Sequence, residues 1–377
     1  IMRKLLRKIH RYLGLTLGLI ISVIGLTGSL YVFQPELTSL FYSDLYRVRN
    51  GNSGADYNTA DVIRSAETKF GKKIRMLQFP ERELETFVLQ LEKDKRWHFF
   101  DPYTAEYLGS MDERRGAFDI ILKAHRTLFM EETGKYINAV SVIFFALFII
   151  SSGVYMWYPK NRNWSKAFRI RTKEKGRKFN HDLHKVSGIV FTIPLLIAAI
   201  TGLFFTFPEF YRNTLSFITG EEAKAKRDKN ILSAPSNGEA LDVYAAFKIM
   251  DNNFKNYKKR RLTMPKSGKG TIYLSYTDAE GIPAGPRKRP YMYIDQYSGK
   301  SVEIYDPAKT NITDSILNNW FAALHFGEAG GIAMRIVLFF AGLMPVTLYI
   351  TGIKIWLKPK KKHKELNLPK EKKTVYI

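Results

Sequence analysis

Four long runs of apolar residues interrupt an otherwise polar chain of 377 residues. Each run is long enough for a helix, which rises about 1.5 Å per residue, to cross a hydrocarbon core of roughly 30 Å. The first run recurs in the middle of the chain, which favours a retained span over a cleaved signal peptide. The pattern therefore predicts four membrane-spanning helices, over residues 12–33, 137–158, 186–207 and 332–357.

The four runs form two copies of one pattern. His10 precedes the first apolar run, and His184 precedes the third run in the same way. The second and fourth runs share a glycine, and His125 or His325 precedes that glycine at nearly the same spacing. The chain is therefore expected to be a membrane protein, mainly α-helical, with four transmembrane helices arranged as two tandem helix–module–helix repeats.

The polar regions 34–136 and 208–331 are each expected to fold as a small α+β module on the outer side. Helical spacing of apolar residues predicts a helix in each module, followed by β-rich segments. Asp101 and Asp295 stand at matching turns, where aspartate most simply accepts hydrogen bonds from backbone N–H groups. The predicted helices are 58–70 and 238–254, and the predicted strand regions are 73–77, 85–91, 96–109, 271–276 and 290–302.

The net charge of +24 is distributed unevenly. Lysine and arginine concentrate in residues 1–11, in the loop 159–185 and in the tail 358–377, whereas 37–136 holds sixteen basic and sixteen acidic residues. The positive-inside rule therefore places both termini and the loop in the cytoplasm. Topology and contact with anionic lipid account for the excess of cations, so no nucleic-acid partner is expected.

The chain contains no cysteine. Disulfides, thiolate-bound iron–sulfur clusters and covalently attached c-type haem are therefore excluded. Any metal site must use histidine, methionine, tyrosine or carboxylate side chains, and the chain has seven histidines.

Four histidines occupy equivalent ends of the predicted spans. His10 and His184 lie at the cytoplasmic ends of the first and third spans, and His125 and His325 lie at the outer ends of the second and fourth. A single histidine near a membrane boundary is commonly an interfacial polar residue, but two pairs at repeat-equivalent positions favour paired ligands. Two facing neutral imidazoles suit the axial positions of a low-spin haem b.

Residues next to these histidines fit the same hypothesis. Gly14 and Gly188 each follow an inner histidine by four residues, so they share its helix face and leave room for a flat macrocycle; close helix packing explains them equally well. Arg11, Arg126 and Lys185 directly follow histidines and are candidate partners for haem propionates. The positive-inside rule also accounts for Arg11 and Lys185.

Three histidines fall outside the pairs. His181 lies three residues before His184 on a similar helix face, so it is an alternative inner ligand. The repeat favours His184, because it aligns His184 with His10. His98 and His363 are expected to be structural or solvated. A zinc site is disfavoured, because each pair lacks a third ligand and the HExxH spacing is absent.

Several segments resemble the PepSY-associated transmembrane proteins, a family that includes iron-uptake reductases acting on ferric siderophores. The resemblance covers nearly the whole chain and is carried by KIHRYLGLTLGLIISVIGLTG, FFDPYTAEYLG, HRTLF, DLHKVSG, YIDQYSGKSV and LHFGEAGG. It implies a bacterial cytoplasmic-membrane protein with two periplasmic PepSY-like modules and two non-covalent b-type haems. By position, His10 and His184 would hold the inner haem iron, and His125 and His325 the outer one. The first turn departs from the family pattern, with Ala105 where glycine is usual.

The same resemblance implies an oxidoreductase that carries electrons outward and reduces Fe(III) bound by a siderophore, which releases Fe(II). The sequence shows no flavin or nicotinamide motif, so a quinol or a cytoplasmic reductase is expected to supply the electrons. Trp97, Tyr103, Tyr297 and Trp320 are candidates to receive the chelate or relay an electron, although interfacial anchoring is the simpler role.

Two other functional classes stay open. PepSY modules elsewhere are linked to the control of peptidases, so a non-enzymatic regulatory or peptidase-inhibitory role is the main alternative. That role would leave the four placed histidines without a purpose. A transporter is less favoured, because the predicted spans lack buried carboxylates, lysines or broken helices that would mark a substrate path.

Overall fold

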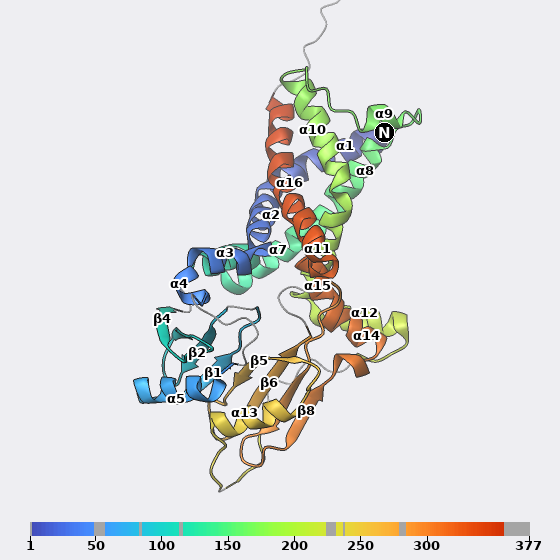
Figure 1. Ribbon diagram of the computed structural model, residues 1–377. Helices are drawn as coiled ribbons and strands as arrows, with labels where there is room; N and C mark the ends of the chain where they lie inside the picture. The colour runs from blue at the N-terminus through green and yellow to red at the C-terminus, as the bar shows by residue number, and fades with distance from the viewer. Residues whose placement is uncertain are drawn as a thin grey trace, which may run out of the picture.

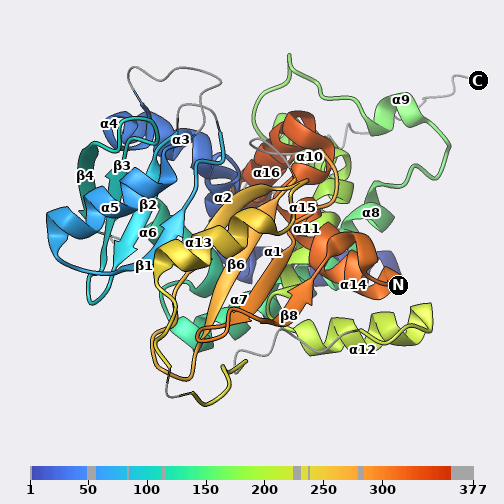
Figure 2. The ribbon, with the colours of Figure 1, turned by 60° about the horizontal axis from the view of Figure 1, so that its bottom comes forward.

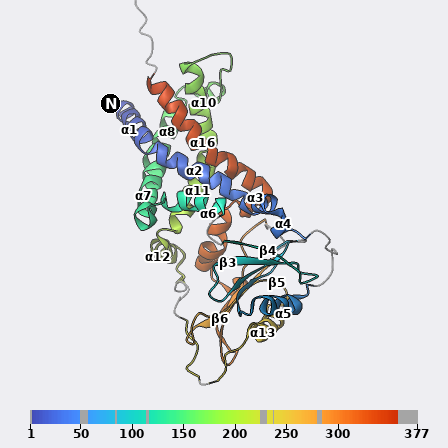
Figure 3. The same cartoon turned by 90° about the vertical axis from the view of Figure 1, so that its left-hand side faces the viewer.

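The computed structural model describes residues 2–48, 57–82, 85–112, 116–223, 231–236, 238–278 and 284–357. Helices gather at one end of the molecule, and a β-sheet lies at the other (Figure 1). The first helix begins and the last helix ends at the end farther from the sheet, as a second view also shows (Figure 3). The N-terminal segment and the predicted modules therefore lie at opposite ends.

Two helices are each long and apolar enough to cross a membrane, Glu131–Trp157 with a mean hydropathy of 2.2 and Glu328–Leu357 with 2.1. They contain the second and fourth predicted spans. The first is interrupted by a π-helical segment, a form that is rare and often occurs at functional sites. Their parts are α7 (Glu131–Phe144), the π-helix η1 (Phe145–Ile150), α8 (Ser151–Trp157), η4 (Glu328–Gly330) and α16 (Gly331–Leu357).

The first and third predicted spans are bent helix pairs. Helices α1 (Met2–Thr16) and α2 (Gly18–Val32) meet at 59°, and α10 (Arg177–Val190) and α11 (Thr192–Phe204) meet at 56°. If each pair is one span, up to four helical spans cross the membrane by length and composition. The expectation of unbroken helices is therefore wrong, and helix continuity no longer counts against a transporter. The two breaks, at Leu17 and Phe191, are equivalent positions when His10 is aligned with His184, so the bend belongs to the repeat.

Helices α2 and α16 cross in close backbone contact. A Cβ atom added to Gly25 would come within 2.5 Å of the carbonyl oxygen of Gly342, and one added to Gly342 within 2.6 Å of the carbonyl oxygen of Gly25. Ser29 donates a hydrogen bond of 2.6 Å to the carbonyl of Phe339 across the same contact. Small residues that let helix backbones approach are typical of helix association in membranes.

An ion pair joins the outer ends of the first and last spans. Arg335 of α16 is 3% exposed, and its guanidinium donates to both carboxylate oxygens of Glu36 at 2.8 and 2.7 Å. Glu36 belongs to α3 (Gln34–Phe41), which α4 (Ser43–Tyr46) follows. Burial alone would raise the pKa of Glu36, but the bonds from Arg335 and the charge of Arg82 outweigh it and lower the pKa to about 2.

The two predicted modules share one antiparallel sheet of eight strands in the order β4-β3-β2-β1-β5-β6-β7-β8. Each module contributes four consecutive strands, and β1 pairs with β5 through Leu77 opposite Leu262. The strands of the two predicted modules thus join in one sheet, and β5 is a strand that the sequence patterns do not predict. The strands are β1 (Ile74–Gln78), β2 (Phe87–Leu91), β3 (Arg96–Phe100), β4 (Tyr107–Asp112), β5 (Lys258–Thr263), β6 (Thr271–Thr277), β7 (Tyr291–Asp295) and β8 (Ser301–Tyr305).

One face of the sheet is covered by the two predicted module helices, α5 (Thr59–Phe70) and α13 (Val243–Asn252) (Figure 2). Leu77, Leu262 and Leu274 point into the core beneath them and are fully buried. Burial of apolar side chains at about 25 cal/mol per Å² is the main stabilising term for such a layer. Both modules therefore depend on one shared core.

Equivalent turns close the β3–β4 and β7–β8 hairpins. The Asp101 carboxylate accepts from the backbone N–H groups of Tyr103 and Thr104, at 2.8 and 3.0 Å, and Asp295 accepts in the same way. The predicted structural role of both aspartates is confirmed. Ala105 adopts a left-handed φ of 57°, close to the 69° of Gly299, so the turn keeps its shape despite the missing glycine.

We expect the Ala105→Gly substitution to stabilise the sheet, because an L-residue costs about 1–2 kcal/mol in the left-handed region and glycine does not. The melting temperature of the purified full chain should rise by about 1–3 °C, measured by tryptophan fluorescence. Gly299→Ala is the matched reverse change and should lower it. An unchanged or lower melting temperature in Ala105→Gly would contradict the expectation.

The other helices connect these parts. They are α6 (Ala117–Thr127), α9 (Trp164–Ala167), α12 (Pro208–Thr219), η2 (Pro307–Lys309), α14 (Ile312–Asp314), the π-helix η3 (Ser315–Trp320) and α15 (Phe321–His325).

Candidate functional site

The two inner histidines face one another. His10 lies on α1 and His184 on α10, and their ring centroids are 6.1 Å apart with the ring planes at 76°. Both histidines precede the bend of their helix pair, on the side away from the sheet. The predicted inner pair is therefore brought together although its members belong to different halves of the chain.

The two outer histidines form a second pair. His125 lies in the last turn of α6, and His325 is the last residue of α15. Their ring centroids are 6.2 Å apart, with the planes at 52°. Neither residue belongs to a membrane-crossing helix; each sits on a short helix that precedes one. The four repeat-equivalent histidines thus make two pairs of nearly equal spacing.

All four rings are held in the same way through Nδ1. Each Nδ1 lies 2.9 to 3.2 Å from a backbone carbonyl oxygen of a neighbouring helix. A carbonyl oxygen can only accept, so each ring carries its proton on Nδ1 and a lone pair on Nε2. Within the described residues no hydrogen bond reaches any of the four Nε2 atoms. The accepting carbonyls belong to Ile149 for His10, Leu348 for His184, Ile24 for His125 and Ala198 for His325.

A repeated sequence pattern supplies these acceptors. Three residues after each accepting carbonyl stands a serine or threonine whose hydroxyl also lies 3.0 to 3.3 Å from the same Nδ1. One residue later stands a glycine whose absent side chain leaves space for the ring. Every predicted span therefore carries one hydroxyl–glycine step that seats a histidine. The four steps are Thr27-Gly28, Ser152-Gly153, Thr201-Gly202 and Thr351-Gly352.

The glycines that face the outer histidines leave less room beside the ring than those that face the inner histidines. A Cβ atom on Gly28 or Gly202 would lie 3.0 Å from Cε1 of the histidine it faces. On Gly153 or Gly352 the same atom would lie 3.4 or 3.6 Å away, which is ordinary van der Waals contact. These glycines can be recognised from the sequence as part of the repeat. The sequence does not show that each of them packs against a histidine ring. The signal that could have found it is the hydroxyl–glycine step common to all four runs.

The geometry fits two ligands on opposite sides of one metal ion. Imidazoles that each bind a metal through a ring nitrogen at about 2 Å have centroids roughly 6 Å apart. Histidine ligands almost always donate the other ring N–H to a carbonyl or carboxylate, which fixes the tautomer and the ring orientation. Both features occur in both pairs, so these residues fit bis-histidine ligation of a haem iron.

Burial favours the neutral form of the outer pair, the form that metal ligation requires. Burial lowers the pKa of His125. Burial, helped by the charge of His125, lowers the pKa of His325 to about 4. The charge of Arg287 acts in the same direction on His325, which places a guanidinium close to this pair.

The predicted glycines beside the inner pair differ from each other. A Cβ atom on Gly14 would meet no atom within 4 Å, so open space adjoins this part of α1. On Gly188 it would lie 3.6 Å from Cδ2 of Leu348, an ordinary packing contact. The helix face at Gly14 is thus open, whereas Gly188 packs against a side chain of α16.

The predicted cations occupy different environments. Arg11 is exposed and lies over the ring of Tyr12, 5.1 Å from its centroid. Arg126 is exposed as well, within electrostatic reach of Tyr31. Lys185 donates a hydrogen bond of 3.0 Å to the carbonyl of Lys166. Of the three, Arg126 is the cation whose charge acts on a paired histidine, where burial and then this charge lower the pKa of His125.

The alternative inner ligand is largely exposed. The side chain of His181 is 60% exposed, and its Nδ1 lies 3.8 Å from Asp182. His98 is buried in β3 against Phe70, with Nε2 3.2 Å from Asp94, so its predicted structural role is confirmed. His363 lies outside the described residues. Within the described part of the chain no group of three or more histidine, aspartate or glutamate side chains could hold a metal ion.

The sheet face opposite α5 and α13 carries tyrosines that the sequence analysis did not single out. Tyr291 stacks on Tyr305 with ring centroids 5.1 Å apart, and Tyr273 lies 5.1 Å from Tyr293. The Tyr305 hydroxyl donates to Oδ1 of Asn319 at 3.0 Å, in the π-helix that leads into α15 and His325. This tyrosine face therefore adjoins the segment that bears the outer pair. Of the aromatic residues named from the sequence, Tyr103 and Tyr297 lie instead in the hairpin turns.

Arginines line the same region. Arg260 pairs with Glu81 at 2.9 Å, and Arg287 pairs with Glu328. Arg261 and Arg289 have no carboxylate partner among the described residues. Burial, with the charges of Arg260 and Arg287, lowers the pKa of Arg289 to about 10. The cluster therefore holds an excess of positive charge, and the charge of Arg287 reaches His325.

Comparison with known proteins agrees with this architecture. A family described as the PepSY-associated TM region matches residues 7–358, which is nearly the whole chain and includes all four paired histidines. A comparison with curated protein sequences gives no match. Because the family match spans both bent helix pairs, both long helices and the sheet, the chain belongs to the PepSY-associated transmembrane family.

Proposed function

We propose that this protein is a di-haem b electron-transfer protein of the bacterial cytoplasmic membrane that reduces ferric siderophore on the periplasmic side. The observation that carries the proposal is the tautomer of the four histidines. Each Nδ1 is held by a carbonyl, which leaves the Nε2 lone pair of each ring available to a metal ion. The ring centroids are 6.1 and 6.2 Å apart in the two pairs, a spacing that suits two imidazoles bound to one metal ion.

The proposed topology treats each bent pair as one span, which makes four. The beginning of α1, the end of α16 and the basic loop 159–185 lie at the end of the molecule away from the sheet. The positive-inside rule places that end in the cytoplasm and the sheet in the periplasm. The inner pair then lies near the cytoplasmic face and the outer pair near the periplasmic face.

The two histidine pairs would divide the transfer of an electron across the membrane into shorter steps. Gly28 contacts His125, and α1 and α2 bend by 59° between His10 and Gly28, so the helix rise places the two pairs roughly 20–25 Å apart. When bound, each haem supplies a one-electron carrier. The histidines hold the two carriers at fixed depths, and the carbonyl and hydroxyl partners of Nδ1 keep each ring oriented.

The outer surface has the chemistry to receive an anionic chelate. Arg261 and Arg289 attract carboxylate or phenolate oxygens, and the tyrosine face offers rings for stacking. One electron converts bound Fe(III) to Fe(II), which hard oxygen donors hold less tightly, so the metal is released. The electron comes from a separate donor, for which a quinol or a cytoplasmic reductase is proposed.

The proposal is tested on the purified full chain. The haem-supplemented protein should bind two haems, and dithionite should produce the sharp visible bands of reduced low-spin haem. Adding a ferric siderophore under anaerobic conditions should reoxidise it, with Fe(II) trapped by a chromogenic chelator. Folded protein without a Soret band would overturn the haem sites. Two bound haems that no ferric chelate reoxidises would overturn the reductase activity alone.

A further inference from the structure

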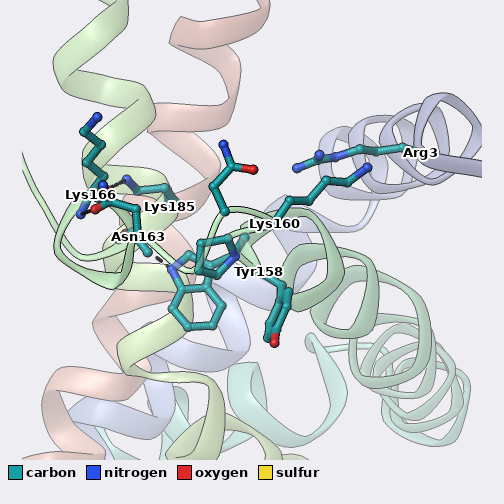
Figure 4. Close-up of a pocket in the computed structure, with 10 residues that line it drawn as sticks. Arg3, Tyr158, Lys160, Asn163, Lys166 and Lys185 are labelled. Atoms are coloured by element: carbon teal, nitrogen blue, oxygen red, sulfur yellow. Dashed lines mark hydrogen bonds between the residues drawn. The ribbon is translucent and has the colours of Figure 1, made fainter.

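A pocket of about 330 Å³ opens at the end of the molecule opposite the sheet (Figure 4). It lies between the beginning of α1, the end of α8 and the loop around α9. Arg3 and Lys160 stand on one side of it, and Lys166 and Lys185 on the other.

The lining is strongly cationic. Four of the ten lining residues are lysine or arginine, and none is aspartate or glutamate. The acids of the adjoining loop are already paired: Asp182 accepts from Arg171 at 2.6 and 3.0 Å, and Glu174 accepts from Lys178 at 3.1 Å. Asp182 approaches the pocket only through Lys185, at 4.0 Å. Within the described chain, Lys185 is thus the one cation of the pocket that contacts a carboxylate.

Aromatic residues mark the same place as a membrane interface. Trp157 ends the span and donates from its indole to the carbonyl of Ala167 at 3.3 Å, and Tyr158 and Trp164 pack beside it. Tyr158 and Trp164 are 54% and 45% exposed. Tryptophan and tyrosine collect where a membrane meets water, at the level of the lipid headgroups.

An apolar groove lies further along the same two helical segments. It is lined by Lys8, Ile9, Tyr12 and Leu13 of α1 and by Phe144 and Phe148 of the second span. From the helix rise, Phe148 lies roughly 13 Å along the span from Trp157. A ligand with an anionic head and a long apolar tail would place the head in the cationic pocket and the tail along the groove.

We propose that the pocket and the groove form a binding site for one anionic phospholipid, with its phosphodiester headgroup among Arg3, Lys160, Lys166 and Lys185. Anionic lipids are concentrated in the cytoplasmic leaflet, and each lysine or arginine near the membrane surface adds to the attraction. The groove distinguishes a lipid from a soluble phosphate, because only a lipid has an acyl chain to cover Phe144 and Phe148. The site does not depend on the redox function.

The test compares two double variants of equal charge on the same loop. Lys160→Gln with Lys166→Gln alters the pocket, whereas Lys173→Gln with Lys175→Gln alters lysines outside it. Each protein is placed in phosphatidylcholine nanodiscs containing increasing phosphatidylglycerol, and retained phosphatidylglycerol is counted by native mass spectrometry. The pocket variant should bind phosphatidylglycerol at least tenfold more weakly than wild type, and the loop control should match wild type.

Two results would overturn this site. Equal weakening in both variants would mean that general surface charge attracts the lipid. Displacement of the lipid by inorganic phosphate or glycerol phosphate at millimolar concentration would mean that the pocket takes a soluble anion and that the groove contributes nothing. Haem content, measured on the same samples, should be unchanged in both variants.

Discussion

Alanine in place of His125 or His325 is expected to remove one of the two haems and leave the other. The outer pair supplies only two ring nitrogens, and the described residues around it contain no third histidine, aspartate or glutamate that could complete a metal site. Loss of one imidazole leaves the haem iron with a single axial ligand. Haem per chain, measured as the pyridine haemochrome, should fall from two to one, and ferric siderophore reduction should fall to the background rate.

The inner pair gives the matched comparison. His184→Ala should lose the inner haem, whereas His181→Ala should keep both, because the His181 side chain is 60% exposed and turned toward Asp182. His98→Ala changes a buried histidine of the sheet and should also keep both haems. Retention of two haems by His125→Ala, or loss of one by His181→Ala, would show that the ligand assignment is wrong.

Alanine at Gly28 or Gly202 is expected to weaken the outer haem while leaving the inner one intact. The new methyl group would lie 3.0 Å from Cε1 of His125 or His325, so the ring must shift by a few tenths of an ångström. That shift lengthens the Nδ1 contacts with the carbonyl and threonine oxygens on the same helix. Changes to partners of this kind typically cost about 10–100-fold in metal affinity.

Gly153→Ala and Gly352→Ala are the controls, because their methyl groups would meet the inner histidines at ordinary contact distances of 3.4 and 3.6 Å. Haem retention in competition with an apo-haem protein measures affinity, and a redox titration measures the midpoint potential of each haem. A simple folding defect would lower both haems together. Equal effects from all four substitutions, or none from Gly28→Ala and Gly202→Ala, would contradict the proposed role of the outer seats.

The sequence by itself determined the apolar runs, the duplication and the histidine pairs. The length of an apolar run is a local property that must match the thickness of the hydrocarbon core. The span regions could therefore be recognised without knowing which helices pack against them. The duplication was equally visible, and it selected His184 over His181 before any contact was known. The turn at Asp101 was also predictable, because aspartate bonds to backbone N–H groups within its own turn.

The tertiary structure alone decided the features that depend on distant partners. The pairing of β1 with β5 joins a strand of the first module to a strand of the second, and strand pairing of this kind leaves no local signal. The bends at Leu17 and Phe191 interrupt sequences that read as continuous apolar helices. The hydroxyl–glycine steps are present in the sequence, but their contacts with the histidine rings are known only from the packing of the helices. A glycine that seats a ring and one that packs two backbones together have the same local sequence, and only the neighbour across the contact distinguishes them.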